Sequence, residues 1–314
     1  MIDRRRFLKT VAAGTAGAAL APTTALAAPG ETRLVLLHTN DTHSRIEPFP
    51  DDAGRYAGLG GVARRATLVE NVRRQNPHVL LLDSGDIFQG TPYFNLFGGR
   101  VEFETMSAMR YDVATLGNHD FDNGVAGLVE MLPYADFEFV SANYDCSGAP
   151  ALAERVRPYT VRRVGPLRVG IFGLGIAFER LVLSALHEGV TYRDPIPVAR
   201  ETVQALRAEG CDYVVCLSHL GYRYEGEDRV SDRVVAQAVP GIDLILGGHT
   251  HTFMETAETV LHEHDRPTLV HQVGWAGIWL GRVEVTFGRD GGVRSASAAP
   301  LLVGSPSGPN ERVG

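Results

Sequence analysis

The sequence has few cysteines for its length of 314 residues. The three that are present, Cys146, Cys211 and Cys216, are odd in number and form no CxxC pair. Cys211 and Cys216 flank one predicted strand, so they would lie roughly 16 Å apart and on opposite faces. They cannot form a disulfide without breaking that strand. We therefore expect three free structural thiols.

The sequence also lacks basic blocks and long hydrophobic runs. Its net charge is −7, and no run of lysine or arginine occurs beyond the N-terminal region. An acidic chain is a poor candidate for binding a nucleic-acid backbone, so no nucleic-acid polymer is expected as a partner. Small anionic substrates remain compatible if cations lie in the site. No apolar segment is long enough for a stable membrane span, and no lipobox cysteine predicts a lipid anchor.

Residues 1–27 have the pattern of a twin-arginine signal peptide. Arg4, Arg5 and Arg6 precede a weakly apolar stretch of alanine, glycine and threonine, and residues 25–27 (ALA) offer a cleavage site. The alternative is a disordered N-terminal arm. We predict export by the twin-arginine route to the periplasm or another extracytoplasmic space. The signal carries a charge of +3, which leaves −10 on the mature chain.

The remaining sequence is typical of one soluble α/β domain over residues 28–303, followed by a disordered tail at 304–314 that is rich in glycine, serine and proline. Of all residues, 44% are hydrophobic and 21% are charged, and we find no internal repeat. Short β-branched runs alternate with amphipathic segments, and residues 268–298 are rich in strands. The pattern predicts strands over 33–38, 79–82, 111–116, 137–140, 159–164, 167–173, 212–217 and 242–246, and helices over 60–74, 101–109, 198–209 and 229–238.

Polar side chains gather where buried strands end. Residues 116–124 (LGNHDFDNG) follow one such strand and bring an Asn, a His and two Asp together. Open α/β sheets place their chemistry at the carboxyl ends of strands. For this stretch alone, an Asx-rich turn with a helix cap is the alternative. Ligand-type residues follow five strands in all: Asp41 and His43, then Asp86, then Asn118 with His119, then His219, then His249 and His251.

The residue types at these strand ends favour a metal centre. Imidazole, carboxylate and amide together suit Mn, Zn, Fe or Co better than Ca or Mg. Seven ligands are too many for one tetrahedral ion but fit two ions that share a carboxylate. Two such ions clamp a phosphoryl group and generate a hydroxide nucleophile near neutral pH. Asp122, three residues after His119, could orient that imidazole, whereas His38 and His271 are left outside the ligand set.

These motifs resemble those of the calcineurin-like metallophosphoesterases, and most closely the metal-binding domain of the bacterial 5′-nucleotidase family. The resemblance covers residues 33–290 and is carried by LHTNDTH at 37–43, GNHDFD at 117–122 and GHTHTF at 248–253. It implies a four-layer α/β/β/α sandwich with two mixed sheets. It also implies an exported enzyme that hydrolyses phosphate esters, with nucleotides as the expected substrates, by attack of metal-bound hydroxide.

The resemblance further implies a role for each site residue. The first metal would be held by Asp41, His43, Asp86 and His251. The second would be held by Asp86, Asn118, His219 and His249, with Asp86 bridging. His119 would not bind metal but would stabilise the phosphate oxygens or protonate the leaving group, and Asp122 would orient it.

Members of that family continue into a second domain that selects the substrate, and the present sequence holds no counterpart of it. We therefore expect either a separate chain that supplies substrate binding or a substrate that is not chosen by its base. Two alternatives remain: a sulfur-ester hydrolase like the thiosulfohydrolases, and a metal-holding subunit whose role is to bind a partner chain. An intact His119 and Asp122 argue against the last of these.

Overall fold

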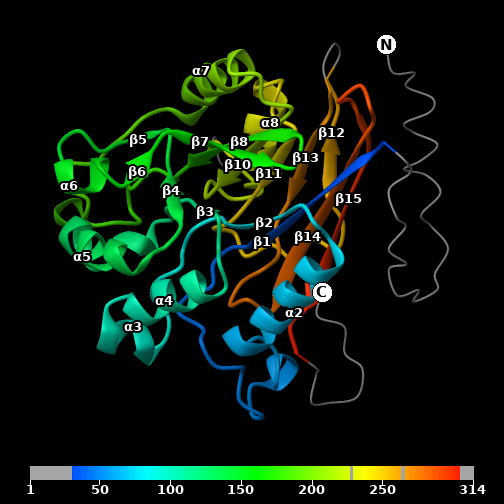
Figure 1. Cartoon of the computed structure of the whole chain (residues 1–314). Helices are drawn as coiled ribbons and strands as arrows, with labels where there is room; N and C mark the ends of the chain where they lie inside the picture. The colour runs from blue at the N-terminus through cyan, green and yellow to red at the C-terminus, as the bar shows by residue number, and fades with distance from the viewer. Residues whose placement is uncertain (1–29, 227–228, 263–265, 305–314) are drawn as a thin grey trace.

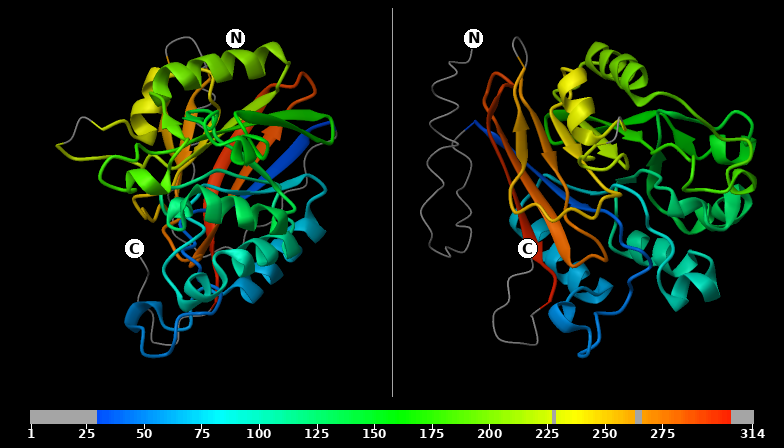
Figure 2. Two further views of the ribbon diagram at one scale, coloured as in Figure 1. Left: turned by 90° about the vertical axis from the view of Figure 1, so that its left-hand side faces the viewer. Right: turned by 180° about the vertical axis from the view of Figure 1, so that it is seen from behind.

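The computed structural model describes residues 30–226, 229–262 and 266–304. Within them, two mixed β-sheets pack face to face, and helices cover the two outer faces (Figure 1, Figure 2). This confirms the predicted α/β class and its four-layer α/β/β/α arrangement. The predicted signal peptide, and all of the predicted tail except Gly304, lie outside the described residues.

The first sheet has seven strands in the order β15-β14-β1-β2-β3-β4-β6. It is mixed, because β1 pairs in parallel with β2 and antiparallel with β14. Alternate residues of β1 face opposite layers: Leu34 and Leu36 pack between the sheets, whereas Val35 and Leu37 pack under the helices. The strands are β1 (Thr32–Thr39), β2 (Val79–Asp83), β3 (Val113–Ala114), β4 (Glu138–Val140), β6 (Val156–Arg157), β14 (Trp279–Phe287) and β15 (Val293–Leu302).

The second sheet has six strands in the order β12-β13-β11-β10-β8-β7. Its four central strands are parallel, and both edge strands pair antiparallel. Parallel strands end at the same edge, so the loops after β10 and β11 lie side by side. The strands are β7 (Tyr159–Val164), β8 (Leu167–Leu174), β10 (Tyr213–Ser218), β11 (Leu244–Leu246), β12 (Glu258–Val260) and β13 (Thr268–His271); β5 (Tyr144–Asp145) and β9 (Thr191–Tyr192) form a separate ribbon.

Helices α7 and α8 cover the second sheet, and α2 to α5 lie against the first (Figure 1). α7 begins at Pro195, three residues earlier than predicted, because the Asp194 side chain accepts a hydrogen bond from the Ile196 N–H and caps the helix. The helices are α2 (Val62–Gln75), α3 (Pro92–Phe97), α4 (Arg100–Ala108), α5 (Gly124–Met131), α6 (Pro150–Ala153), α7 (Pro195–Ala208) and α8 (Asp232–Ala238), with 3-10 turns at Gly54–Tyr56, His119–Phe121, Leu132–Tyr134 and Ser184–Leu186.

Helix α3 was not predicted from the sequence. The Thr91 hydroxyl caps the helix by accepting from the Tyr93 N–H at 3.3 Å, and Pro92 occupies the first turn. Gly98 ends the helix in the left-handed region, at φ 66°. The residues that begin and end this helix were therefore recognisable in the sequence, but the helix between them has only six residues.

The strand predicted over 111–116 is shorter in the structure and pairs only at Val113–Ala114. After Ala114 the chain leaves the sheet, and the Thr115 hydroxyl bonds the Val140 carbonyl at 2.8 Å. All three cysteines are buried and free, as predicted. None of the described helices is both long and apolar enough to cross a membrane.

Candidate metal centre

The seven predicted ligands lie on loops that follow β1, β2, β3, β10 and β11. Five of them have a positive φ although none is glycine: Asp41 (49°), His43 (47°), Asp86 (54°), His249 (69°) and His251 (51°). Such a conformation costs on the order of 1–3 kcal/mol for an ordinary residue and persists only where the surroundings enforce it. The strained turns direct side chains from separate strands toward one region.

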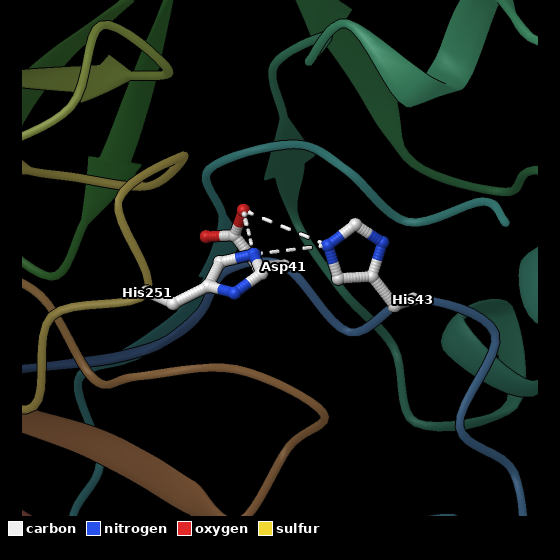
Figure 3. A group of neighbouring side chains, drawn as sticks. All are labelled: Asp41, His43 and His251. Carbon is white, nitrogen blue, oxygen red and sulfur yellow. Dashed lines mark hydrogen bonds and ion pairs between the residues drawn. The ribbon is translucent and has the colours of Figure 1, made fainter. Parts of the chain in front are cut away.

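The first group of converging side chains consists of Asp41, His43 and His251. Their potential ligand atoms all lie within 4.8 Å of one another. The two histidines approach with their Nε2 atoms 3.1 Å apart, and the Nε2 of His251 lies 3.3 Å from the Asp41 Oδ1. Figure 3 shows the three side chains facing one another, Asp41 and His43 from the loop after β1 and His251 from the loop after β11. Two imidazole nitrogens and a carboxylate oxygen are a donor set suited to a transition-metal ion.

The second group consists of Asp86, His219 and His249, and their potential ligand atoms also lie within 4.8 Å of one another. The Nε2 of His219 lies 3.0 Å from the Asp86 Oδ2. The side-chain oxygen of Asn118 lies 2.9 Å from the His249 Nδ1, which adds an amide oxygen to this group. The structure therefore divides the seven predicted ligands between two neighbouring groups.

Asp86 lies between the two groups. Its Oδ2 is 3.0 Å from the Nε2 of His219 in the second group and 3.9 Å from the Nε2 of His43 in the first. Its Oδ1 accepts a hydrogen bond from the His119 backbone N–H at 2.8 Å. Burial acts to raise the pKa of Asp86, but His219 and the other nearby imidazoles outweigh it and lower the pKa overall. An ionised carboxylate in this position is suited to bridging two cations.

Backbone carbonyls orient two of the histidines for metal binding. The Nδ1 of His219 donates to the Ser84 carbonyl at 2.7 Å, and the Nδ1 of His43 donates to the Phe88 carbonyl at 3.3 Å. A carbonyl can only accept, so Nδ1 carries the proton in each ring and Nε2 faces the site.

The surroundings of the His219 Nε2 are suited to a cation. Its Nε2 is buried and makes no well-directed hydrogen bond, despite its proximity to Asp86. Burial acts to lower the pKa of His219, but the charge of Asp86 outweighs it and raises the pKa to about 10. The negative charge that holds a proton there would also favour a metal ion in its place. The nitrogen and oxygen donors of both groups thus fit two divalent ions.

His119 and Asp122 form a pair at the edge of the two groups. The His119 Nδ1 lies 3.0 Å from the Asp122 Oδ2, and their side chains are 35% and 30% exposed. This hydrogen bond is the main cause that raises the pKa of His119. The ring of His119 lies 5.4 Å from that of His43, and a cavity of about 360 Å³ opens beside Asp122. A substrate can therefore reach the imidazole, which is poised to hold a proton.

Residues 34–253 match the sequence profile of the family described as calcineurin-like phosphoesterase. The chain belongs to this family. The match confirms the predicted resemblance and places the chain among metal-dependent phosphoric ester hydrolases. The individual ligand and catalytic roles stay predictions.

Similar proteins are 5′-nucleotidases. A snake venom 5′-nucleotidase from Crotalus adamanteus is 36% identical over 295 residues, which are 88% of this chain and 49% of the relative. The human 5′-nucleotidase is 35% identical, with coverage of 88% and 50%. The solved 5′-nucleotidase precursor from Thermus thermophilus has a TM-score of 0.79 and 36% identity over 87% of this chain and 55% of that one. The chain spans about half the length of the curated relatives it matches.

In this phosphoesterase, Asp120 holds together the two loops that carry Asp86 and Asn118. It is almost fully buried, and its two carboxylate oxygens accept four backbone N–H bonds at 2.7–3.2 Å. Two donors, Gly117 and Asp86, belong to different loops. Gly117 permits this approach, because a Cβ there would overlap the Asp86 carboxylate. Asp120 therefore positions Asp86 without facing the metal groups itself.

Replacing Asp120 by asparagine should destabilise the fold. One oxygen would become an NH₂ group facing two backbone donors, and each buried unsatisfied donor costs about 1–3 kcal/mol. We expect the free energy of unfolding to fall by roughly 2–6 kcal/mol, measured by urea denaturation of the metal-loaded chain. The exposed Asp136→Asn variant is the control and should unfold like the wild type. An unchanged midpoint for Asp120→Asn would contradict this role.

Sequence reasoning missed three residues that support the ligands. Asn40 donates to the Asp41 Oδ2 and to the Gly274 carbonyl, each at 2.6 Å. Gln272 accepts from the Thr250 hydroxyl at 3.1 Å and so fixes the loop that carries His249 and His251. Trp275 stacks on His251 with 5.7 Å between ring centroids and 9° between planes. Asn40 lies inside a recognised motif, whereas nothing in the sequence marked Gln272.

Proposed function

We propose that this chain hydrolyses phosphate esters with two divalent metal ions and that nucleoside 5′-monophosphates are among its substrates. The observation that carries the proposal is the pair of ligand groups joined by Asp86. Asp41, His43, Asp86 and His251 would hold one ion, and Asp86, Asn118, His219 and His249 the other. Manganese, zinc, iron and cobalt suit this mixture of nitrogen and oxygen donors. The names of the related 5′-nucleotidases support the substrate.

The residues of the chain would act as follows. When bound, the two ions polarise the phosphoryl oxygens and provide a nucleophilic water near neutral pH. Asp122 accepts the Nδ1 proton of His119, so the Nε2 of that ring remains available to the substrate. Because the pKa of His119 is raised, the imidazole can deliver a proton to the leaving-group oxygen. The cavity beside Asp122 offers space for the leaving group.

Phosphate release by the purified chain loaded with Mn²⁺ tests this function. We expect hydrolysis of both 5′-AMP and p-nitrophenyl phosphate, because each presents a phosphate monoester to the two ligand groups. The phosphodiester bis(p-nitrophenyl) phosphate is the comparison substrate. Failure to hydrolyse any of these esters with metal bound, followed as phosphate release from the two monoesters and as p-nitrophenol release from the diester, would contradict the proposal and favour a metal-holding subunit.

The same assay separates the remaining alternatives. A preference for 5′-AMP of more than about a hundredfold would mean that the base is recognised within these 314 residues. Comparable turnover of both monoesters would support a substrate-binding partner chain or a base-independent substrate range. Hydrolysis of a thiosulfate ester in place of phosphate esters would indicate the sulfur-ester chemistry.

We further propose that the enzyme acts outside the cytoplasm, after export by the twin-arginine route. The basis is the arginine run at residues 4–6, which lies outside the described residues. Replacing Arg4 and Arg5 by lysine should leave the unprocessed chain in the cytoplasm of a bacterial host with this export route, as detected by fractionation. Unchanged export of that variant would contradict this route.

A further inference from the structure

A second cavity is lined in part by a residue that adjoins a predicted metal ligand in the sequence. Its volume is about 240 Å³, and its lining includes Leu220, the residue directly after His219. The chain beyond Leu220 is bound to the other ligand loop, because the Tyr222 N–H donates to the Thr250 hydroxyl at 3.0 Å. Thr250 lies between His249 and His251 in the sequence. The cavity wall and the metal-binding loops therefore form one structural unit.

Two arginines line this cavity from different segments of the chain. Arg180 comes from the loop after β8, and Arg229 comes from the segment before α8. Arg180 is exposed and makes no hydrogen bond or ion pair with the other residues that the structure describes. Arg180 adopts φ 65°, a backbone conformation that is unfavourable for residues other than glycine. Its side chain is thus available to a ligand and is presented by a strained turn.

The rest of the lining is suited to an anion. Ile176 and Leu220 are buried and give the cavity apolar walls. The described lining carries one carboxylate, Glu179, against two guanidinium groups. A guanidinium offers paired N–H donors that match a phosphate or carboxylate group. None of the lining residues of this cavity is a predicted metal ligand, so metal binding does not account for the two arginines.

We propose that this cavity binds a second anionic group of the substrate, a phosphate or carboxylate on the molecule whose ester phosphate lies at the metal centre. The inference rests on the proposed function, because it assumes that the ester binds at the two ligand groups. The preferred substrates would be phosphate esters with a further anionic group, such as nucleoside diphosphates. Simple monoesters would be hydrolysed but bound less tightly.

Binding of non-hydrolysable phosphonates to the Mn²⁺-loaded chain tests this inference without turnover. Methylphosphonate reports binding at the metals alone, and alkane bisphosphonates with one to five carbons between the phosphorus atoms add a second anion at increasing distance. We expect the dissociation constant of at least one bisphosphonate, measured by calorimetry, to be at least tenfold lower than that of methylphosphonate. The absence of such an advantage over the whole series would overturn the inference, and the hydrolysis assay would be unaffected.

Variants then locate the second anion. Arg180→Ala and Arg229→Ala should each reduce the bisphosphonate advantage about tenfold and leave methylphosphonate binding unchanged, which also shows that they fold. Glu179→Gln should increase the advantage, because it removes the opposing charge. Arg193→Ala, an exposed arginine paired with Glu201 at 3.8 Å, is the control with the same charge change. An advantage that persists in both arginine variants, or falls equally in the control, would overturn the proposal.

Discussion

Replacing Asp86 by asparagine is expected to lower phosphate release about a thousandfold or more. The carboxylate approaches both sets of ligands, at 3.0 Å from the Nε2 of His219 and 3.9 Å from the Nε2 of His43. An asparagine side chain has nearly the same shape but no charge and only one oxygen acceptor. Loss of one shared anionic ligand removes several kcal/mol of charge stabilisation from the reaction.

Metal content distinguishes this effect from simple misfolding. We expect Asp86→Asn to retain fewer than two ions per chain by elemental analysis, whereas the wild type should hold two. Asp52→Asn, an exposed aspartate, changes the charge by the same amount and should leave both metal content and turnover as in the wild type. Two tightly held ions and normal turnover in Asp86→Asn would rule out a bridging role.

Replacing His119 by alanine should have a different signature: kcat falls about 10²–10⁴-fold while both metals stay bound. The imidazole lies next to His43, but its Nδ1 is engaged by Asp122 at 3.0 Å, and it belongs to neither ligand group. Its loss should therefore affect proton delivery and leave the metals in place. Asp122→Asn should give a smaller loss, because the imidazole remains but is less well oriented.

His78→Ala is a suitable control for His119→Ala. His78 directly precedes β2, at the strand end opposite the metal centre, and its loss should leave kcat unchanged. Stopped-time phosphate assays, together with metal analysis of the same samples, give the comparison. Normal turnover in His119→Ala with both metals retained would show that another group protonates the leaving group.

The layered fold and the ligand residues were predictable because their signals are local. Each buried strand is a short apolar run, and its polar end follows directly in the sequence, as in the loop that contains Asn118 and His119. Parallel strands bring such ends together, so a list of strand ends already outlines a site. The pairing of His119 with Asp122 follows from a separation of only three residues.

Contacts between distant segments left no comparable signal. His38 was set aside as a residue outside the site, yet its Nε2 lies 2.9 Å from the Nδ1 of His271, 233 residues away and in the other sheet. Gln272 supports the ligand loop from the end of β13, and its position depends on the pairing of β13 with β11, which is not encoded locally. Asp120 was read only as part of a polar cluster, because three of its four backbone partners, at positions 86–88, become neighbours only in the folded chain.

The most direct measurement is a titration of metal-free chain with Mn²⁺, in which phosphate release from p-nitrophenyl phosphate is followed at each step. If two ions act together across Asp86, activity should rise mainly with the second equivalent and reach a plateau at two ions per chain. Addition of excess chelator should abolish this activity. Full activity with one equivalent, or activity that survives chelation, would contradict a dinuclear centre built by Asp86 and the two ligand groups.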